Sequence, residues 1–300
     1  MLRSFLQQQR MRLLVALLIG LSIFGLRYSG ALGARARGDL EWPMVAAQML
    51  VAGEDPYTYK IRMSDGSMAA MYPLTTTLIA APLAFFPPRL TGALFVGIAS
   101  ALLAFGLTGQ RQWWRLLVFV SCPYIVAVQY AQWPILLSAA YFLPWLLPVV
   151  IAKPHLGAVV ALCGRWSPTT LGITVALVLL SFVLYPTWPF AFLAHTSAYD
   201  GAIPLLVLPF GPLLLLLIPY WRNRPTRYLL LLSIVPQRLI YDLMMPLIVA
   251  RSPRVLLMLT AISWAFALFA AYPDMLWQIA VVGIYGPLAV EAWLIQRSAP

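Results

Sequence analysis

The chain has 300 residues, of which 62% are hydrophobic and only 10% are charged, whereas a soluble domain typically has roughly 25% charged residues. This composition excludes a water-soluble globular protein. The formal net charge of +11 does not indicate a nucleic-acid-binding protein, because the arginines lie beside apolar segments and form no single basic patch. We therefore expect a membrane protein that contacts lipid and binds no nucleic acid.

The chain begins with a basic segment followed by an apolar run. Arg3, Arg10 and Arg12 precede the apolar residues 13–26, and no clean small-residue cleavage site follows them. Positive charge beside a membrane helix favours the cytoplasmic side. We expect an uncleaved first membrane helix whose N-terminus is cytoplasmic.

Residues 30–68 form the longest polar segment, and we interpret them as the first extracytoplasmic loop. Five of the nine acidic residues lie in this segment, namely Asp39, Glu41, Glu54, Asp55 and Asp65. A loop of this size and charge is the part of the chain in which we expect chemistry.

Asp39 stands immediately before a stretch, residues 40–52, with Val45, Met49 and Ala52 at helical spacing. This spacing predicts a short amphipathic helix at the membrane interface, ended by Gly53 and the proline after it. Asp39 has two interpretations. Its carboxylate caps the helix, or it is a general base at the water-facing mouth of a membrane cavity.

Further apolar runs follow, and several are too short to cross a bilayer alone. They are residues 71–86, 90–107, 116–128, 135–151, 171–188, 203–220, 228–236, 239–249, 255–272 and 276–294. Prolines interrupt them at Pro144, Pro148, Pro154, Pro204, Pro209, Pro236 and Pro246. The pattern predicts an all-α fold, one transmembrane domain over residues 1–300 with about 9–12 helices, some of them broken around a cavity.

Arginine-rich connectors predict the orientation of the later helices. Arg222, Arg224 and Arg227 form one connector, and Arg251 with Arg254 forms another. Both are expected on the cytoplasmic side. The residues midway between them, 237–242, are then expected near the outer face of a multi-pass protein of the cell membrane.

Two groups of cations fall within or beside apolar segments. Lys153 and His155 flank Pro154 in a long apolar stretch, where a lysine at the bilayer centre costs about 2.5–3.5 kcal/mol. Arg238 directly follows Gln237, and the acidic residue Asp242 lies four residues after it. Cations at one depth suit a phosphate group. The alternatives are a lysine that extends to the interface and a structural Arg238–Asp242 pair.

Other chemistries lack their signatures. His195 has no second histidine at ligand spacing, which argues against a metal site. The sequence contains neither a phosphate-binding glycine loop nor a nucleophile elbow, which argues against nucleotide hydrolysis and serine hydrolase chemistry. We expect no metal and no cofactor.

The order of these residues resembles a family of membrane enzymes. The pieces are DLEWPMVAAQMLVAGEDPYTY from Asp39, Tyr72-Pro73 at the start of the next span with Pro82 and Pro87 at its end, Gln132 in AQWPILL, Lys153-Pro154, and YDL from Tyr241. Their order is similar to that of the GT-C superfamily of glycosyltransferases, and most similar to its polyprenol-phosphate-mannose-dependent family 87. The resemblance covers most of the chain.

The resemblance implies a hexosyltransferase of cell envelope biosynthesis with an extracytoplasmic active site. It transfers a sugar, mannose in that family, from a polyprenyl-phosphate carrier to a glycolipid or glycan acceptor, with inversion. Asp39 is then the general base, while Lys153, His155 and Arg238 bind the donor phosphate. The residues implied in acceptor or sugar binding are Glu41, Tyr57, Tyr72, Gln132, Gln237, Tyr241 and Asp242.

Two alternatives remain open from the sequence. A lipid or solute transporter or flippase also uses intramembrane cations and broken helices, but it would not need Asp39 and would be expected to have an internal repeat. A noncatalytic scaffold of the same fold is the other alternative, since Ala131 stands where the family usually has glycine and Trp42-Pro43 replaces its tyrosines.

Overall fold

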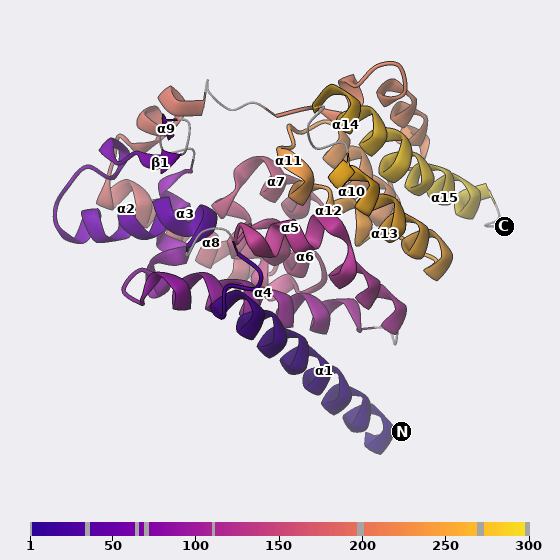
Figure 1. Ribbon diagram of the computed structural model, residues 1–300, viewed down its shortest axis with the longest axis horizontal. Coiled ribbons are helices and arrows are strands. Elements are labelled where there is room, and N and C mark those ends of the chain that lie inside the picture. The colour runs from indigo at the N-terminus through magenta and orange to yellow at the C-terminus, as the bar shows by residue number, and fades with distance from the viewer. Residues whose placement is uncertain are drawn as a thin grey trace. The chain divides into compact units, whose positions relative to one another are not determined.

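The computed structural model describes residues 2–33, 37–63, 66–68, 72–109, 112–196, 201–268 and 273–297. Within these ranges the regular elements are helices, apart from one antiparallel hairpin, formed by β1 (Ile61–Met63) and β2 (Gly66–Met68), and one isolated antiparallel bridge between Ala202 and Gln237 (Figure 1). The predicted helical fold class is confirmed. The hairpin is a small addition inside the segment that we interpret as the outer loop.

The chain forms two compact units, which are described separately. Unit 1 comprises Met1–Leu17, Leu102–Ala127 and Gly201–Pro300, and unit 2 comprises Leu18–Ala101 and Val128–Asp200. Three helices, α1 (Leu2–Tyr28), α4 (Pro88–Leu107) and α5 (Cys122–Gln129), contribute residues to both units.

Unit 2 contains Asp39 and Lys153. Its other helices are η1 (Gly38–Leu40), α2 (Glu41–Val51), η2 (Pro56–Thr58), α3 (Leu74–Ala80), η3 (Ala81–Leu83), α6 (Pro134–Phe142), η5 (Pro144–Ala152), α7 (Pro154–Cys163), α8 (Pro168–Leu184) and α9 (Trp188–Thr196).

Unit 1 contains Arg238. Its other helices are η4 (Trp113–Val120), η6 (Pro204–Leu206), η7 (Gly211–Tyr220), α10 (Arg224–Ser233), α11 (Leu239–Asp242), α12 (Met244–Leu247), α13 (Pro253–Leu268), α14 (Pro273–Ala280), η8 (Val281–Tyr285) and α15 (Gly286–Arg297). In this unit α15 packs against α10 and α13 (Figure 1).

The described helices include several that are long and apolar enough to cross a membrane. Three segments have the required length and composition, namely Leu6–Tyr28, Pro88–Leu107 and Met275–Arg297. The number rises to five if each of two bent helix pairs is counted as one span. The bent pairs are α5 with α6 and α8 with α9. These segments support a membrane-spanning protein, and many of the remaining predicted runs are divided into shorter helices.

Proline explains many of the divisions, as expected from the sequence. Pro144 begins η5 one residue after α6 ends, with Leu143 between them, and Pro154 begins α7 directly after Lys153. Proline has no N–H and its fixed φ suits the first helical position, so it starts a helix and prevents the previous one from continuing. The predicted run 135–151 is therefore two helices.

The arginine connector at residues 222–227 is shorter than predicted. Arg224 and Arg227 lie inside α10, whose N-cap is Asn223. The side chain of Asn223 accepts a hydrogen bond from the Thr226 amide at 3.4 Å. An Asn N-cap with a proline in the first turn favours the start of a helix at this point. The helix therefore begins before Arg227, and both arginines lie in its first turns.

Helix α2 has the predicted position but buries a different face. Its buried residues are Trp42, Pro43, Met44, Ala46 and Ala47, whereas the predicted face of Val45 and Met49 is half-buried and Ala52 is exposed. The difference arises because α2 packs on α3, with Trp42 in an aromatic core. The helix ends as expected, with Gly53 in the left-handed region at φ +74°.

Two glycines allow α1 and α4 to approach closely within unit 2. A Cβ on Gly20 would lie 2.9 Å from the carbonyl oxygen of Gly97, and one on Gly97 would lie 2.9 Å from the Cβ of Phe24. Small residues at such a crossing are typical of membrane helix pairs, because close packing replaces the hydrophobic effect there.

Candidate functional site

Asp39 is held in place by its own backbone. Its amide donates to the carbonyl of Tyr130 at 2.9 Å. The residue before it, Gly38, has φ +60°, and a Cβ there would lie 2.3 Å from the Tyr130 oxygen. Only glycine combines that conformation with such a close approach. The segment before α2 is thus fastened to the turn that joins α5 and α6.

The carboxylate of Asp39 faces Tyr72 and does not cap α2. The hydroxyl of Tyr72 donates to Oδ2 of Asp39 at 3.3 Å. The N-cap of α2 is Leu40, which forms no side-chain cap, and Asp39 itself belongs to η1. The helix-cap interpretation is therefore wrong. Asp39 lies within the short 3₁₀ helix η1, so the residue at the N-cap position of α2 is Leu40 and not Asp39.

The turn that fastens Asp39 also carries Gln132. Ala131 in this turn has φ +50°, which is uncommon for a residue other than glycine. Gln132 is wholly buried, and neither Nε2 nor Oε1 has a hydrogen-bond partner among the described residues. An unpaired buried polar group costs about 1–3 kcal/mol. A buried amide in this state offers a donor and an acceptor to a ligand.

Lys153 lies at the break between η5 and α7 and is only 5% exposed. The break requires Gly157, since a Cβ there would lie 1.8 Å from the carbonyl oxygen of Val150. The Gly157 amide in turn donates to the Lys153 carbonyl at 2.7 Å. His155 is half-buried in the first turn of α7. The lysine is thus fixed at a helix break inside the protein, as its apolar surroundings predicted.

Helix α3 connects Tyr72 to the segment that carries Lys153. The hydroxyl of Thr75 donates to the carbonyl of Ile151 at 2.8 Å, and that of Thr76 donates to Ala152 at 2.6 Å. These carbonyls stand directly before Lys153, and the threonines follow closely after Tyr72. The base candidate and the cation candidate of unit 2 are therefore linked by side-chain contacts. The sequence reasoning missed both threonines, although three consecutive threonines after Tyr-Pro in an apolar span were a visible signal.

Tyr57 lies in an aromatic cluster beside Asp39, and Glu41 precedes a member of that cluster, Trp42, in α2. We define the cluster as Trp42, Tyr57, Tyr72, Tyr185 and His195. The Trp42 ring centroid lies 5.2 Å from that of Tyr57 and 6.5 Å from that of Tyr72. Glu41 Oε1 accepts from the hydroxyl of Tyr59 at 2.9 Å.

Tyr57 has a structural role within this cluster. Its hydroxyl donates to the carbonyl of Tyr72 at 3.3 Å. Burial, reinforced by the nearby Tyr185 and Asp55, raises the pKa of Tyr57 above its ordinary value, so the phenol stays protonated as a donor. Through this hydrogen bond Tyr57 positions the backbone at Tyr72.

The predicted site residues of unit 1 form a buried hydrogen-bonded turn. Gln237 is wholly buried, and its Nε2 donates to the Leu232 carbonyl at 2.7 Å and to the hydroxyl of Tyr285. Asp242 is also wholly buried and accepts from the backbone amide of Arg238 at 2.8 Å.

The partners that the structure gives to Gln237 and Asp242 are structural. Tyr241 is 4% exposed. Arg238 is half-buried at the N-cap position of α11. Arg238 therefore stands at the end of a buried turn, bonded through its backbone amide to Asp242.

The candidate site residues of unit 2 thus include a half-buried carboxylate, a phenol donor, an unpaired buried amide and a buried lysine. Among the described residues, no three His, Cys, Asp or Glu side chains gather in a way that would hold a metal ion. No protein-family model, no curated protein and no solved structure matches the chain.

Proposed function

We propose that this chain is a membrane glycosyltransferase that uses a polyprenyl-phosphate sugar. It transfers the sugar, mannose by its resemblance to family 87, to a hydroxyl group of an extracytoplasmic glycolipid or glycan, with inversion. Such a reaction needs a base for the acceptor hydroxyl and positive charge near the phosphate. The observation that carries the proposal is the setting of Asp39, a half-buried carboxylate fixed by Tyr130 and bonded by Tyr72.

In the proposed reaction the acceptor oxygen attacks the anomeric carbon on the face opposite the phosphate. A bond forms between that oxygen and the carbon, and the bond from the carbon to the phosphate oxygen breaks, with its electron pair leaving on the polyprenyl phosphate. The hydroxyl proton passes to Asp39. Because Tyr72 bonds Oδ2, Oδ1 is the atom that accepts it.

The other residues of unit 2 have supporting roles in the proposal. The leaving group is a phosphate monoester that already carries charge and needs no acid, so Lys153 stabilises the charge that develops on its bridging oxygen. His155 lies beside it on α7. Gln132 offers both a donor and an acceptor, which suits a sugar hydroxyl pair. The resemblance also implies a donor-phosphate role for Arg238, which belongs to unit 1.

The experiment is sugar transfer by the purified full chain with radiolabelled polyprenyl-phosphate mannose and a membrane glycolipid extract as acceptor. Asp39→Asn keeps the shape of the side chain but removes the base, and a general base contributes about 10²–10⁴-fold. We expect transfer to fall by at least a hundredfold. Glu54→Gln is the matched control, because Glu54 is an exposed acid of the same loop, and it keeps wild-type transfer.

The outcomes separate the three interpretations. Wild-type transfer by Asp39→Asn removes the proposed mechanism. A chain without transfer in any variant, but with uptake or flipping of a fluorescent lipid in vesicles, is a transporter. A chain with neither activity is a noncatalytic scaffold.

A further inference from the structure

The two arginine connectors of unit 1, residues 222–227 and 251–254, meet at Arg251. The guanidinium of Arg251 donates a hydrogen bond to the side chain of Asn223, the N-cap residue of α10. Its backbone amide donates to Oε2 of Glu291 in α15 at 2.8 Å. The start of α10, the segment before α13 and the later part of α15 are therefore held side by side.

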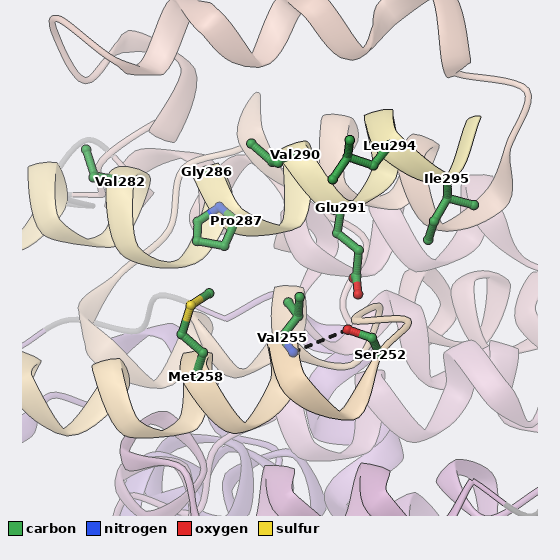
Figure 2. A pocket seen from close by; sticks show the side chains of 10 residues that line it. All are labelled: Ser252, Val255, Met258, Val282, Gly286, Pro287, Val290, Glu291, Leu294 and Ile295. Carbon is green, nitrogen blue, oxygen red and sulfur yellow. Dashed lines mark hydrogen bonds between the residues drawn. The ribbon is translucent and has the colours of Figure 1, made fainter. Parts of the chain in front are cut away.

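The start of α13 also faces the end of α15. Ser252 and Val255 line the same pocket as Leu294 and Ile295, and Figure 2 shows the two pairs on opposite helices. Ser252 accepts a hydrogen bond from the Val255 amide at 3.3 Å, in the first turn of α13. The basic end of unit 1, as we call these three segments together, contains six arginines, namely Arg222, Arg224, Arg227, Arg251, Arg254 and Arg297.

The positive charge of the basic end faces outward. Arg222 and Arg254 are exposed. The acids of unit 1 whose side chains the structure describes are Asp242 and Glu291, and both are buried. A cluster of four to eight basic residues beside a membrane helix attracts anionic lipid headgroups. The basic end therefore has the charge that suits such a partner.

The basic end also lies where a candidate membrane span ends. The span Met275–Arg297 ends at one of its arginines, whose guanidinium lies over the Trp293 ring at 4.1 Å from the centroid. Trp221 is 54% exposed, and Arg227 lies over its ring at 5.8 Å. Tryptophan with one apolar and one wet side is typical of the membrane–water interface. This position favours a lipid surface over a soluble acidic protein as the partner.

We propose that the basic end of unit 1 is an interaction surface for anionic phospholipid headgroups, with Arg222 and Arg254 in contact with the lipid phosphate. Guanidinium groups offer forked donors that match phosphate oxygens. Phosphatidylglycerol has a net negative charge, which the arginines attract. Phosphatidylcholine has the same phosphate, but its own ammonium group cancels that charge. The lipid comes from the bilayer, and the interaction does not depend on sugar transfer.

The test is native mass spectrometry of the full chain in micelles containing equal amounts of phosphatidylglycerol and phosphatidylcholine with identical tails. We expect the wild type to retain phosphatidylglycerol in excess. Arg222→Gln and Arg254→Gln should each reduce that excess by about fivefold, because one arginine near an anionic lipid surface contributes roughly that factor. Both side chains are exposed, so neither change disturbs the packing of the unit.

Arg89→Gln with Arg165→Gln is the matched control, because it removes the same charge from two exposed arginines of unit 2. Arg165 also stands beside a tryptophan, Trp166, as Arg222 stands beside Trp221. The control should keep the wild-type preference. An equal loss in the control would mean that the lipid responds only to the total charge of the chain, which overturns the proposal. Equal retention of the two lipids by the wild type overturns it too, as does displacement of phosphatidylglycerol by inorganic phosphate, since the surface would then take the free ion.

Discussion

Tyr72 donates a hydrogen bond to Asp39 across 33 residues of sequence, at 3.3 Å between the hydroxyl oxygen and Oδ2. The contact joins the segment before α2 to the segment before α3. In the first turn of α3, Thr75 and Thr76 donate hydrogen bonds to the backbone carbonyls of the two residues before Lys153. A carboxylate and a cation that are far apart in sequence are thereby positioned by one short helix.

The first prediction concerns the phenol of Tyr72. Tyr72→Phe keeps the ring stacked near Trp42 but removes the donor to Asp39. A hydrogen bond to a charged group contributes about 1.5–3 kcal/mol, so we expect kcat for sugar transfer to fall by roughly tenfold or more with little change in KM. Steady-state kinetics on the full chain measures both.

Tyr59→Phe is the control for this substitution, because the Tyr59 hydroxyl donates to Glu41, which is expected to bind the acceptor and not to take the proton. It should leave kcat within about twofold of wild type. An equal loss in both variants would mean that any disturbance of the loop impairs transfer, and it would contradict a specific role for Tyr72.

The second prediction concerns Lys153, one of only two lysines in the chain. Removing the ammonium in Lys153→Ala should raise KM for the polyprenyl-phosphate donor and lower kcat, because the charge stabilises both the bound and the leaving phosphate. Lys60→Ala is the matched control, since Lys60 is exposed in the loop. An unchanged dependence of rate on donor concentration in Lys153→Ala excludes the proposed contact.

The burial of Lys153 is testable without any substrate. Lys60 is exposed and Lys153 is 5% exposed, so an amine-reactive reagent should label Lys60 rapidly and Lys153 slowly. Peptide mass spectrometry reads the two rates separately. Equal labelling rates would show that Lys153 reaches water freely.

The third prediction separates steric contact from backbone conformation in the segment that holds Asp39. Gly38 and Gly53 both have positive φ, +60° and +74°, but a Cβ on Gly38 would lie 2.3 Å from the Tyr130 oxygen and one on Gly53 would meet nothing within 4 Å. Gly53→Ala should therefore lose only the conformational term, about 1 kcal/mol, and Gly38→Ala should lose more.

Thermal inactivation of the detergent-solubilised chain measures this difference. We expect Gly38→Ala to inactivate at a temperature several degrees below that of Gly53→Ala, and to lose transfer activity because Asp39 is displaced. If the two variants inactivate at the same temperature, the packing of Gly38 against Tyr130 contributes nothing to stability.

The helix breaks and the break at Lys153 were predictable because proline acts locally. Pro144 and Pro154 remove amides and fix φ wherever they occur, so their effect is visible in the sequence. Of the two interpretations of Asp39, the helix cap is wrong for the opposite reason. The 3₁₀ turn of η1 depends on the distant Tyr130 carbonyl, and no local pattern indicates that contact.

Some properties of the buried polar residues are visible in the sequence, and others depend on distant contacts. Glu291 is the single acid in a candidate span, and that isolation alone marks it as a functional candidate. By contrast, the sequence gives no means of telling that both amide atoms of Gln132 lack hydrogen-bond partners among the described residues while Nε2 of Gln237 has two. Which buried amides are paired depends on tertiary contacts such as the one between Gln237 and Tyr285.

The fourth prediction uses this contrast between two wholly buried glutamines. Gln237→Met leaves the Leu232 carbonyl and the Tyr285 hydroxyl without their donor, so it should destabilise the chain by about 1–3 kcal/mol. Gln132→Met has the same change of side chain but breaks no hydrogen bond among the described residues. It removes two unpaired polar atoms, so it should raise the temperature of thermal inactivation.

The same Gln132→Met variant should lose sugar transfer, because the amide that is unfavourable in the empty protein is the group that we expect to bind the sugar. A residue that lowers stability and is needed for activity is typical of binding sites. Gain of thermal stability with loss of transfer supports that role. A stabilised variant with full transfer would show that Gln132 takes no part in the reaction, and a destabilised one would show that its amide is paired.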